Sequence, residues 1–219
     1  MNFLNKFDVL LFDLDGLLID SLDALSKSLV GAVSTYCEDA QLQEFMRYDK
    51  ENPGLSRFEK IDFFIHKILK NDSFDPELIF NKFENASLLA RKNAKMSNDF
   101  FILNSLFHGK IWILLTNCDN DQLKEVVSWF GIDSIFGSNL FGTPPSKESR
   151  AKEIRLRYPN NKILSISDSE SDGLIAKSNN FDFLYIEEFS RGNQNWGLNN
   201  YYLIPSIRDL INEEPILIY

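Results

Sequence analysis

A short apolar run, Val9–Phe12, leads directly into two carboxylates and a glycine, Asp13, Asp15 and Gly16. An uninterrupted apolar run of this length is typical of a central strand of a parallel sheet, which is buried on both faces. Open α/β sheets bind their ligands at the carboxyl ends of such strands. The two acids point to the same side unless the backbone turns between them. Two negative charges at such a short distance repel each other, so a cation or a shared proton is implied. The alternative is that both acids cap the next helix or lie solvated in a turn.

The region after this strand has helical periodicity. Ser21 stands in an N-cap position before apolar residues at helical spacing, which predicts a helix to about Tyr36. The same spacing predicts a second helix over residues 58–69, and Pro76 opens a third. We therefore expect residues 20–95 to be helical.

From Ser97 onward, predicted helices and strands alternate. The expected strands are 111–115, 163–166, 183–186 and, as the last one, 201–204; the expected helices are one through Leu103 and Leu106, 123–130, 146–157, 174–178, and a closing helix around Leu210. Strands separated by helices predict a parallel sheet covered on both faces. The expected fold class is α/β, with a Rossmann-like three-layer core formed by residues 1–19 and 96–219 and a helical domain inserted at 20–95.

Composition and charge restrict the function classes. The 219 residues carry 23 basic and 32 acidic side chains, a net charge of −9, so nothing supports general binding to nucleic acid or to anionic membranes. An anionic substrate would need a locally basic pocket. Cys37 and Cys118 have no metal-binding spacing and are expected to be reduced. No apolar run approaches the roughly 20 residues that span a bilayer, and a soluble, cytoplasmic protein is expected. The sequence makes no prediction of oligomeric state.

Polar side chains follow the later strands as well. Thr116 and Asn117 follow the strand 111–115, Lys147 stands at a helix start, and the acidic segment 167–172 follows the strand 163–166. Because parallel strand ends converge at one edge of a sheet, we expect these groups to meet the first two aspartates.

Taken together, the segments DLDGLLIDS, LLTN, PPSKES and DSESD resemble the four motifs of the haloacid dehalogenase-like phosphohydrolase superfamily, in the same order. The helical insert directly after the first motif resembles the subclass with a small α-helical cap. Residues 52–57, NPGLSR, are similar to a cap loop of the β-phosphoglucomutase and phosphoglycolate phosphatase branch.

The resemblance implies a role for each motif residue. Asp13 would be the nucleophile that forms an aspartyl-phosphate, and Asp15 would protonate the leaving alcohol and then activate water. Thr116 would bind a phosphoryl oxygen through its hydroxyl, helped by the Asn117 backbone N–H. Lys147 would bridge the nucleophile and the phosphoryl group. The alternatives are a strand-end hydroxyl bonded to backbone for Thr116 and a solvated surface lysine for Lys147.

The resemblance also implies a Mg²⁺ site. Asp168 would bind the ion together with the Asp13 carboxylate and the Asp15 backbone carbonyl, because a hard cation takes oxygen ligands. Asp172 would hold the ion or its waters. Ser167 departs from the family pattern, which commonly has Gly or an acid there.

Arg57 is the candidate for substrate binding in the helical insert. On an anionic chain, an arginine after a Gly-Leu-Ser turn would reach across the cleft to a second anionic or hydroxylated part of the substrate. The alternative is a surface arginine paired with Glu59 or Asp62. Arg91 and Lys92 are weaker candidates.

These expectations favour a Mg²⁺-dependent phosphatase acting on a small phosphorylated metabolite, such as a sugar phosphate or a phosphoglycolate-like compound. The runner-up is a phosphosugar mutase. The mutase pattern has a histidine four residues beyond the hydroxyl matched by Ser21, where this chain has Leu25. Dehalogenase action is disfavoured because that branch lacks the acid that Asp15 supplies. A non-catalytic binding protein is disfavoured because such a protein has no physical need of all the motif residues.

Overall fold

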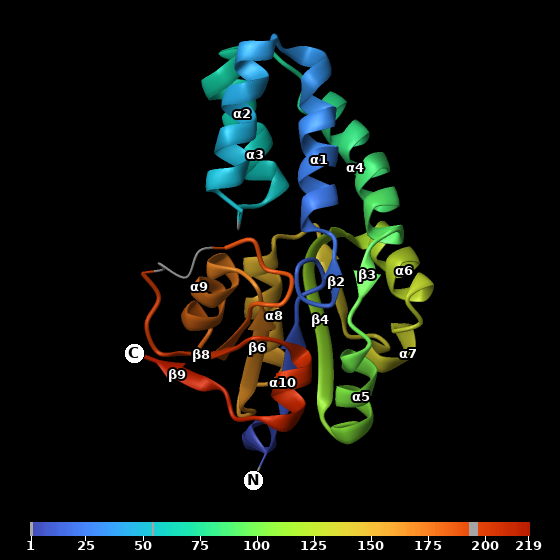
Figure 1. The fold of residues 1–219 in the computed structure, drawn as a ribbon, viewed down its shortest axis with the longest axis vertical. Coiled ribbons are helices and arrows are strands. Elements are labelled where there is room, and N and C mark those ends of the chain that lie inside the picture. Colours follow the sequence, from blue (N-terminus) through green and yellow to red (C-terminus); the bar gives the residue numbers. More distant parts are fainter. Residues whose placement is uncertain (1, 54, 193–196) are drawn as a thin grey trace. The chain divides into compact units, whose positions relative to one another are not determined.

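The computed structural model describes residues 2–53, 55–192 and 197–219, and its ribbon is drawn in Figure 1. The chain divides into two compact units, which are described separately: an α/β unit, Met1–Asp20 with Lys95–Tyr219, and a helical unit, Ser21–Ala94. Among the helices of the described residues, none combines the length and the apolar character needed to cross a membrane.

The α/β unit is built on a mostly parallel sheet. Within the described residues the sheet has seven strands in the order β5-β4-β1-β6-β7-β8-β9. In chain order these are β1 (Val9–Phe12), β4 (Ile111–Asp119), β5 (Leu140–Thr143), β6 (Ile163–Ser167), β7 (Asp182–Ile186), β8 (Tyr201–Ile204) and β9 (Ile216–Ile218). Among the strand pairs of this sheet that the structure describes, β8–β9 is antiparallel and the others are parallel. The α/β class and the parallel sheet predicted from the sequence are confirmed.

Strand β1 is central and buried on both faces, as its apolar run predicts. Val9 and Leu11 belong to the cluster under α8 (Lys147–Arg157) and α9 (Glu170–Ser178). Phe12 faces the opposite side, where its ring stacks on Trp112 with centroids 4.9 Å apart. This side also contacts α5 (Asp99–Leu106), which packs against α10 (Ile207–Asn212). The helices α6 (Asn120–Trp129) and α7 (Asp133–Phe136) connect β4 to β5.

Two strand predictions in this unit are corrected by the structure. The edge strand β5 was not predicted, because Gly142 and Thr143 interrupt its short apolar run. Residues 201–204 are not the last strand, since β9 follows the closing helix and pairs with β8. Helix α9 begins at Glu170, four residues before the expected 174, because the Ser169 hydroxyl caps it by accepting from the Asp172 N–H.

The helical unit contains four α-helices among its described residues: α1 (Leu22–Val33), α2 (Asp39–Glu51), α3 (Arg57–Phe63), which continues as a π-helical segment (Phe64–Leu69), and α4 (Glu77–Lys92). Its core is apolar and aromatic, with Phe45 and Phe64 in edge-to-face contact. Helix α2 had no separate prediction, because its sequence is mostly polar; a capping box between Glu38 and Gln41 marks its start. Ser21 precedes α1 as expected but makes no capping hydrogen bond. Gly54 of the predicted turn lies outside the described residues.

Short elements complete the two units. A 3₁₀ turn (Phe3–Lys6) precedes β1, and another (Ser34–Tyr36) follows α1. A two-stranded ladder pairs β2 (Ile19–Asp20) with β3 (Lys95–Met96). The α/β unit therefore holds itself together at both points where the chain leaves and re-enters it.

Candidate active site

Asp13 is placed by the geometry of β1. Its backbone N–H donates to the Ile166 carbonyl at 3.0 Å, so the ladder with β6 continues one residue past the strand. Side chains alternate along a strand, and Asp13 therefore shares the face of Val9 and Leu11, toward α8 and α9. Its Oδ1 accepts from the Leu14 N–H at 2.8 Å. The carboxylate that ends the buried strand thus points into a helix-covered layer and not into solvent.

Asp15 lies beyond a turn of the backbone. The chain bends at Leu14, whose carbonyl accepts from the N–H groups of Leu18 and Ile19. Gly16 adopts φ +83°, a conformation that suits glycine. Two acids two residues apart on a strand point to the same side only if the backbone does not turn between them. Here it does turn, so Asp13 and Asp15 need not share a face. Asp15 is half-buried and remains near enough for its charge to raise the pKa of Asp13.

Lys147 joins this carboxylate from a different part of the chain. It is the first residue of α8, a helix capped by the Ser146 hydroxyl, and only 8% of it is exposed. Its Nζ lies 3.0 Å from Asp13 Oδ2 and 2.7 Å from Asp172 Oδ1. The alternative of a solvated surface lysine is wrong. The ammonium instead bridges two carboxylates: Asp13, directly after β1, and Asp172, in the first turn of α9.

The charges in this layer are unbalanced. Burial raises the pKa of Asp13 to about 7; the charges of Asp172 and Asp15 act in the same direction and Lys147 opposes them. Burial would lower the pKa of Lys147, but Asp13 and Asp172 together hold it above its ordinary value. Burial, with the charges of Asp13 and Asp172, raises the pKa of Asp168 well above its usual range. With all three carboxyls ionised, the single ammonium of Lys147 would not neutralise them, which agrees with the raised pKa values of Asp13 and Asp168.

Asp172 is the main partner of the lysine. Burial acts to raise its pKa, but Lys147 holds it below the ordinary value. Its Oδ2 accepts hydrogen bonds from the hydroxyls of Ser167 and, at 3.0 Å, Ser169. The carboxylate is thus oriented toward Lys147. That it also contacts a metal ion stays a prediction.

Ser167 has a role that the sequence did not reveal. It is 1% exposed, and its hydroxyl donates to Asp172 and lies 3.4 Å from Asp13 Oδ2. The register explains this position: Phe12 pairs with Ile166, so the next residues, Asp13 and Ser167, stand side by side on one face. Ser167, the residue that departs from the family pattern, therefore connects Asp13 to Asp172, which pairs with Lys147.

The donor set fits Mg²⁺. Three carboxylates with little solvent exposure, Asp13, Asp168 and Asp172, interact with one another and with one lysine, so a divalent cation would offset their mutual repulsion. Over the part of the chain that the structure describes, no three carboxylate, imidazole or thiol groups form a metal cluster by themselves. Mg²⁺ does not require one, because it binds through one or two carboxylates and keeps several waters. Asp13, Asp168 and the Asp15 carbonyl would suffice.

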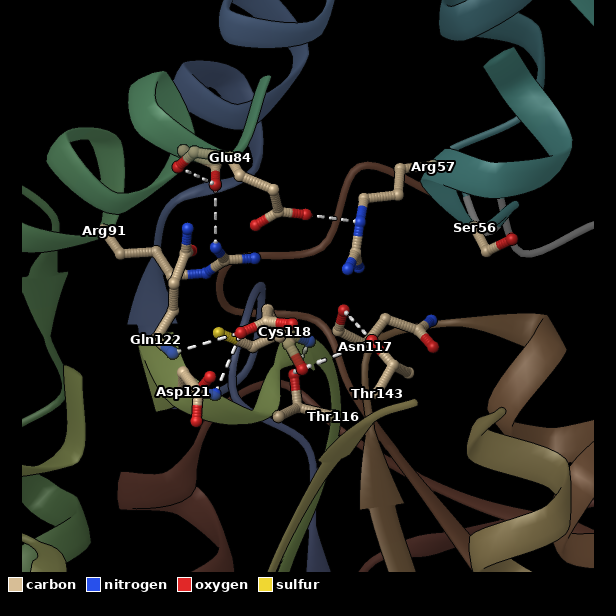
Figure 2. Close-up of polar contacts among 12 residues, drawn as sticks. Ser56, Arg57, Glu84, Arg91, Thr116, Asn117, Cys118, Asp121, Gln122 and Thr143 are labelled. Atoms are coloured by element: carbon tan, nitrogen blue, oxygen red, sulfur yellow. Dashed lines mark hydrogen bonds and ion pairs between the residues drawn. The ribbon is translucent and has the colours of Figure 1, made fainter. Parts of the chain in front are cut away.

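Thr116 and Asn117 lie at the same edge of the sheet, at the end of β4. Thr116 is buried, and its hydroxyl accepts from the Cys118 N–H at 3.2 Å. Thr143, at the end of β5, donates to the carbonyls of Asn117 and Cys118 at 3.1 and 3.4 Å (Figure 2). Thr143 thus bonds to the last part of β4, the strand that carries both phosphate-binding candidates. Sequence reasoning missed it together with its strand, although a hydroxyl ahead of the Pro144–Pro145 turn was a visible signal.

Arg57 is engaged within the helical unit. Its Nε lies 2.6 Å from Glu84 Oε1 (Figure 2). Its guanidinium also lies over the Phe58 ring, 4.4 Å from the ring centroid. The expected alternative partners bond elsewhere: Glu59 accepts from the Ser56 N–H, and Asp62 contacts His66. Substrate binding by Arg57 stays a prediction, and any such contact would compete with Glu84.

The two weaker candidates differ in burial. Arg91 is 4% exposed and donates to the Ser87 hydroxyl at 3.2 Å, whereas Lys92 is exposed. Arg91 is therefore buried and bonded within the helical unit, and substrate binding by either residue stays a prediction.

Comparison with known proteins identifies this architecture. Neither a protein-family model nor a curated protein sequence matches the chain. Solved structures do match: a predicted phosphatase from Clostridium acetobutylicum, with a TM-score of 0.69 at 20% identity, covers 93% of this chain and 96% of its own. CbbY from Rhodobacter sphaeroides in complex with phosphate, with a TM-score of 0.68 at 13% identity, also covers 93% and 96%. A haloacid dehalogenase-like hydrolase from Streptococcus pneumoniae, with a TM-score of 0.64 at 15% identity, covers 87% and 89%.

This chain has the haloacid dehalogenase-like fold. The resemblance noted in the four sequence motifs is thereby confirmed at the level of the fold, over nearly the whole chain. Within this fold, the residues that match the motifs lie at the carboxyl edge of the sheet: directly after β1, on β4, at the start of α8, and from the end of β6 into the first turn of α9.

Proposed function

We propose that this chain is a Mg²⁺-dependent phosphatase that hydrolyses a small phosphorylated metabolite through an aspartyl-phosphate on Asp13. The observation that carries the proposal is the buried Lys147 ammonium, held 3.0 Å from Asp13 and 2.7 Å from Asp172. A cation fixed beside a nucleophilic carboxylate offsets the repulsion that an incoming phosphate would meet. Similar folds in a predicted phosphatase and in a phosphate-bound protein support the same reaction class.

In the first step, an Asp13 carboxylate oxygen attacks phosphorus and the bond from phosphorus to the ester oxygen breaks. Asp15 gives its proton to the departing alcohol oxygen, so a neutral alcohol leaves. Lys147 stabilises the charge on the phosphoryl group during transfer, and Thr116 and the Asn117 N–H bind its oxygens. The product is the alcohol and phosphorylated Asp13.

In the second step, the Asp15 carboxylate takes a proton from water as the water oxygen attacks phosphorus. The bond between phosphorus and the Asp13 oxygen breaks, inorganic phosphate leaves, and both acids return to their starting states. Bound Mg²⁺ would neutralise charge on the transferring phosphoryl group. Asp13, Asp168 and the Asp15 carbonyl would hold it, and YfnB of Bacillus subtilis, another chain of similar fold, was crystallised bound to magnesium.

Hydrolysis is preferred over the mutase reaction because of Leu25. This residue occupies the position where the mutase pattern has a proton-carrying histidine, and here its side chain packs against the apolar core of the helical unit. An apolar side chain neither donates nor accepts a proton, so it supplies no acid or base for transfer to a second sugar hydroxyl.

The proposal is tested with the purified chain and p-nitrophenyl phosphate, followed by a panel of phosphorylated metabolites. We expect phosphate release that requires Mg²⁺ and stops with excess EDTA. Interconversion of sugar 1- and 6-phosphates with a bisphosphate primer, without matching phosphate release, would favour the mutase. No turnover of any compound with Mg²⁺ present would leave a binding role as the better explanation.

Replacing Asp15 with asparagine tests the proton-transfer role. The variant is expected to lower kcat by about 100-fold, because general acid and base catalysis typically contributes that much or more. Mg²⁺ binding, measured by calorimetry without substrate, should change little, since the backbone carbonyl remains. Loss of Mg²⁺ binding in this variant would show that the Asp15 side chain serves the metal and not the proton.

A further inference from the structure

A chain of hydrogen bonds leads from the sheet interior to the backbone of Asp168. The Tyr185 hydroxyl on β7 donates to Ser190 Oγ at 2.5 Å, and Ser190 Oγ donates to the Asp168 carbonyl at 2.9 Å. Tyr185 is 1% exposed and pairs in register with Ser167, the residue before Asp168. Neither Tyr185 nor Ser190 belongs to any of the four motifs.

The direction of the Ser190 hydroxyl is fixed by its neighbours. A serine hydroxyl has one proton to donate and two lone pairs that accept. Both lone pairs are used, one by the Tyr185 hydroxyl and the other by the Gly192 N–H at 3.1 Å. Burial raises the pKa of Tyr185, which keeps its phenol protonated and therefore a donor. The Ser190 proton is consequently directed at the Asp168 carbonyl.

This carbonyl lies in the turn that links β6 to α9. The same turn contains Ser169, the cap of α9, and α9 carries Asp172. Fixing the peptide after Asp168 fixes the direction in which its side chain leaves the backbone. It also fixes the start of the helix that presents the partner of Lys147.

We propose that Ser190, oriented by Tyr185, is a positioning residue that sets the Asp168 carboxylate for Mg²⁺ binding. The inference rests on the proposed function, because Asp168 is a metal ligand only under that proposal. Hydrogen-bonded groups behind metal ligands commonly change metal affinity 10- to 100-fold when removed. Ser190 touches neither substrate nor metal and acts through the backbone of Asp168.

The experiment is a calorimetric titration of Mg²⁺ into the full chain, freed of metal with EDTA and without substrate. Ser190→Ala is expected to raise the Kd about tenfold, and Ser190→Thr, which keeps the hydroxyl, to stay within about twofold. Ser105→Ala is the matched control, because Ser105 also donates to a backbone carbonyl, that of Ile102, but on the exposed surface of α5. Its Kd should equal that of the wild type.

The outcomes separate the inference from the function on which it rests. Unchanged Mg²⁺ affinity in a folded Ser190→Ala protein overturns the inference alone, as does an equal loss in Ser190→Thr. If Ser190→Ala does not fold, Tyr185→Phe decides: a Kd several-fold above wild type supports the inference, and an unchanged Kd overturns it. A wild-type chain that binds no Mg²⁺ overturns both the inference and the metal site of the proposed function.

Discussion

Asp13→Asn is expected to reduce kcat/KM for Mg²⁺-dependent hydrolysis of p-nitrophenyl phosphate by at least about 10⁴-fold. An amide has no charged oxygen to attack phosphorus, so the covalent route through an aspartyl-phosphate is lost and not merely slowed. The same change removes the carboxylate that pairs with Lys147 at 3.0 Å. Phosphate release under saturating substrate, with mass spectrometry of acid-quenched protein to detect phosphorylated Asp13, measures both effects.

The matched control is Asp8→Asn at the other end of β1. Asp8 is exposed and accepts from the Lys162 N–H at 2.8 Å, so it flanks the same strand as Asp13 but lies at the opposite edge of the sheet. Its activity should equal that of the wild type. Turnover by Asp13→Asn near the wild-type rate would show that another group attacks phosphorus, or that no covalent intermediate forms.

The fold was predictable where burial is complete. Four apolar residues in a row at Val9–Phe12, and similar runs in β4, β6 and β7, leave little choice but a central parallel sheet, because strands with one solvated face alternate. The edges were less predictable, since an edge strand needs less apolar surface. Thus β5, with Gly142 in its middle, was missed, and so was β9, which lies mostly exposed.

The candidate site was predictable as a set of residues but not as a set of contacts. Strand ends of a parallel sheet meet at one edge, so Asp13, Lys147 and Asp168 could be expected there from their order alone. Which carboxylate forms the second ion pair with Lys147 depends on the residue at which α9 begins. Ser169 caps that helix four residues earlier than the apolar spacing indicated, and the shift brings Asp172 into the helix that faces Lys147.

Contacts through hydroxyls were the hardest to foresee. Ser167 reaches Asp13 because of strand register, and Ser190 reaches Asp168 from a loop more than twenty residues later in the chain. Serine is common in turns, so its presence in a sequence does not distinguish a solvated hydroxyl from a buried donor. For Ser167, the pairing of β6 with β1 and β7 decides that its hydroxyl is a buried donor, and sequence periodicity does not specify that pairing.

Lys147→Met is expected to lower kcat about 10³-fold, because removing a preorganised group that stabilises transition-state charge typically costs up to that factor. It should also move the pH dependence in a defined direction. Burial raises the pKa of Asp13 to about 7, and Lys147 opposes that rise. A nucleophilic carboxylate must be ionised, so activity should fall as the pH drops through the pKa of Asp13. Without the ammonium this pKa rises further, and the acid limb of the profile of kcat/KM moves to higher pH.

Two control variants, Lys147→Arg and Lys152→Met, distinguish the effect of the positive charge at residue 147 from a general effect of mutating α8. Arginine retains the positive charge, so the acid limb should stay near its wild-type position even where imperfect geometry lowers kcat. Lys152 lies on the same helix, is exposed and pairs with Glu148 at 2.7 Å, and its replacement should leave both rate and profile unchanged. A Lys147→Met profile whose acid limb stays at the wild-type pH, or moves lower, would mean that the lysine does not control ionisation of the nucleophile. Its role would then be confined to binding the phosphoryl group.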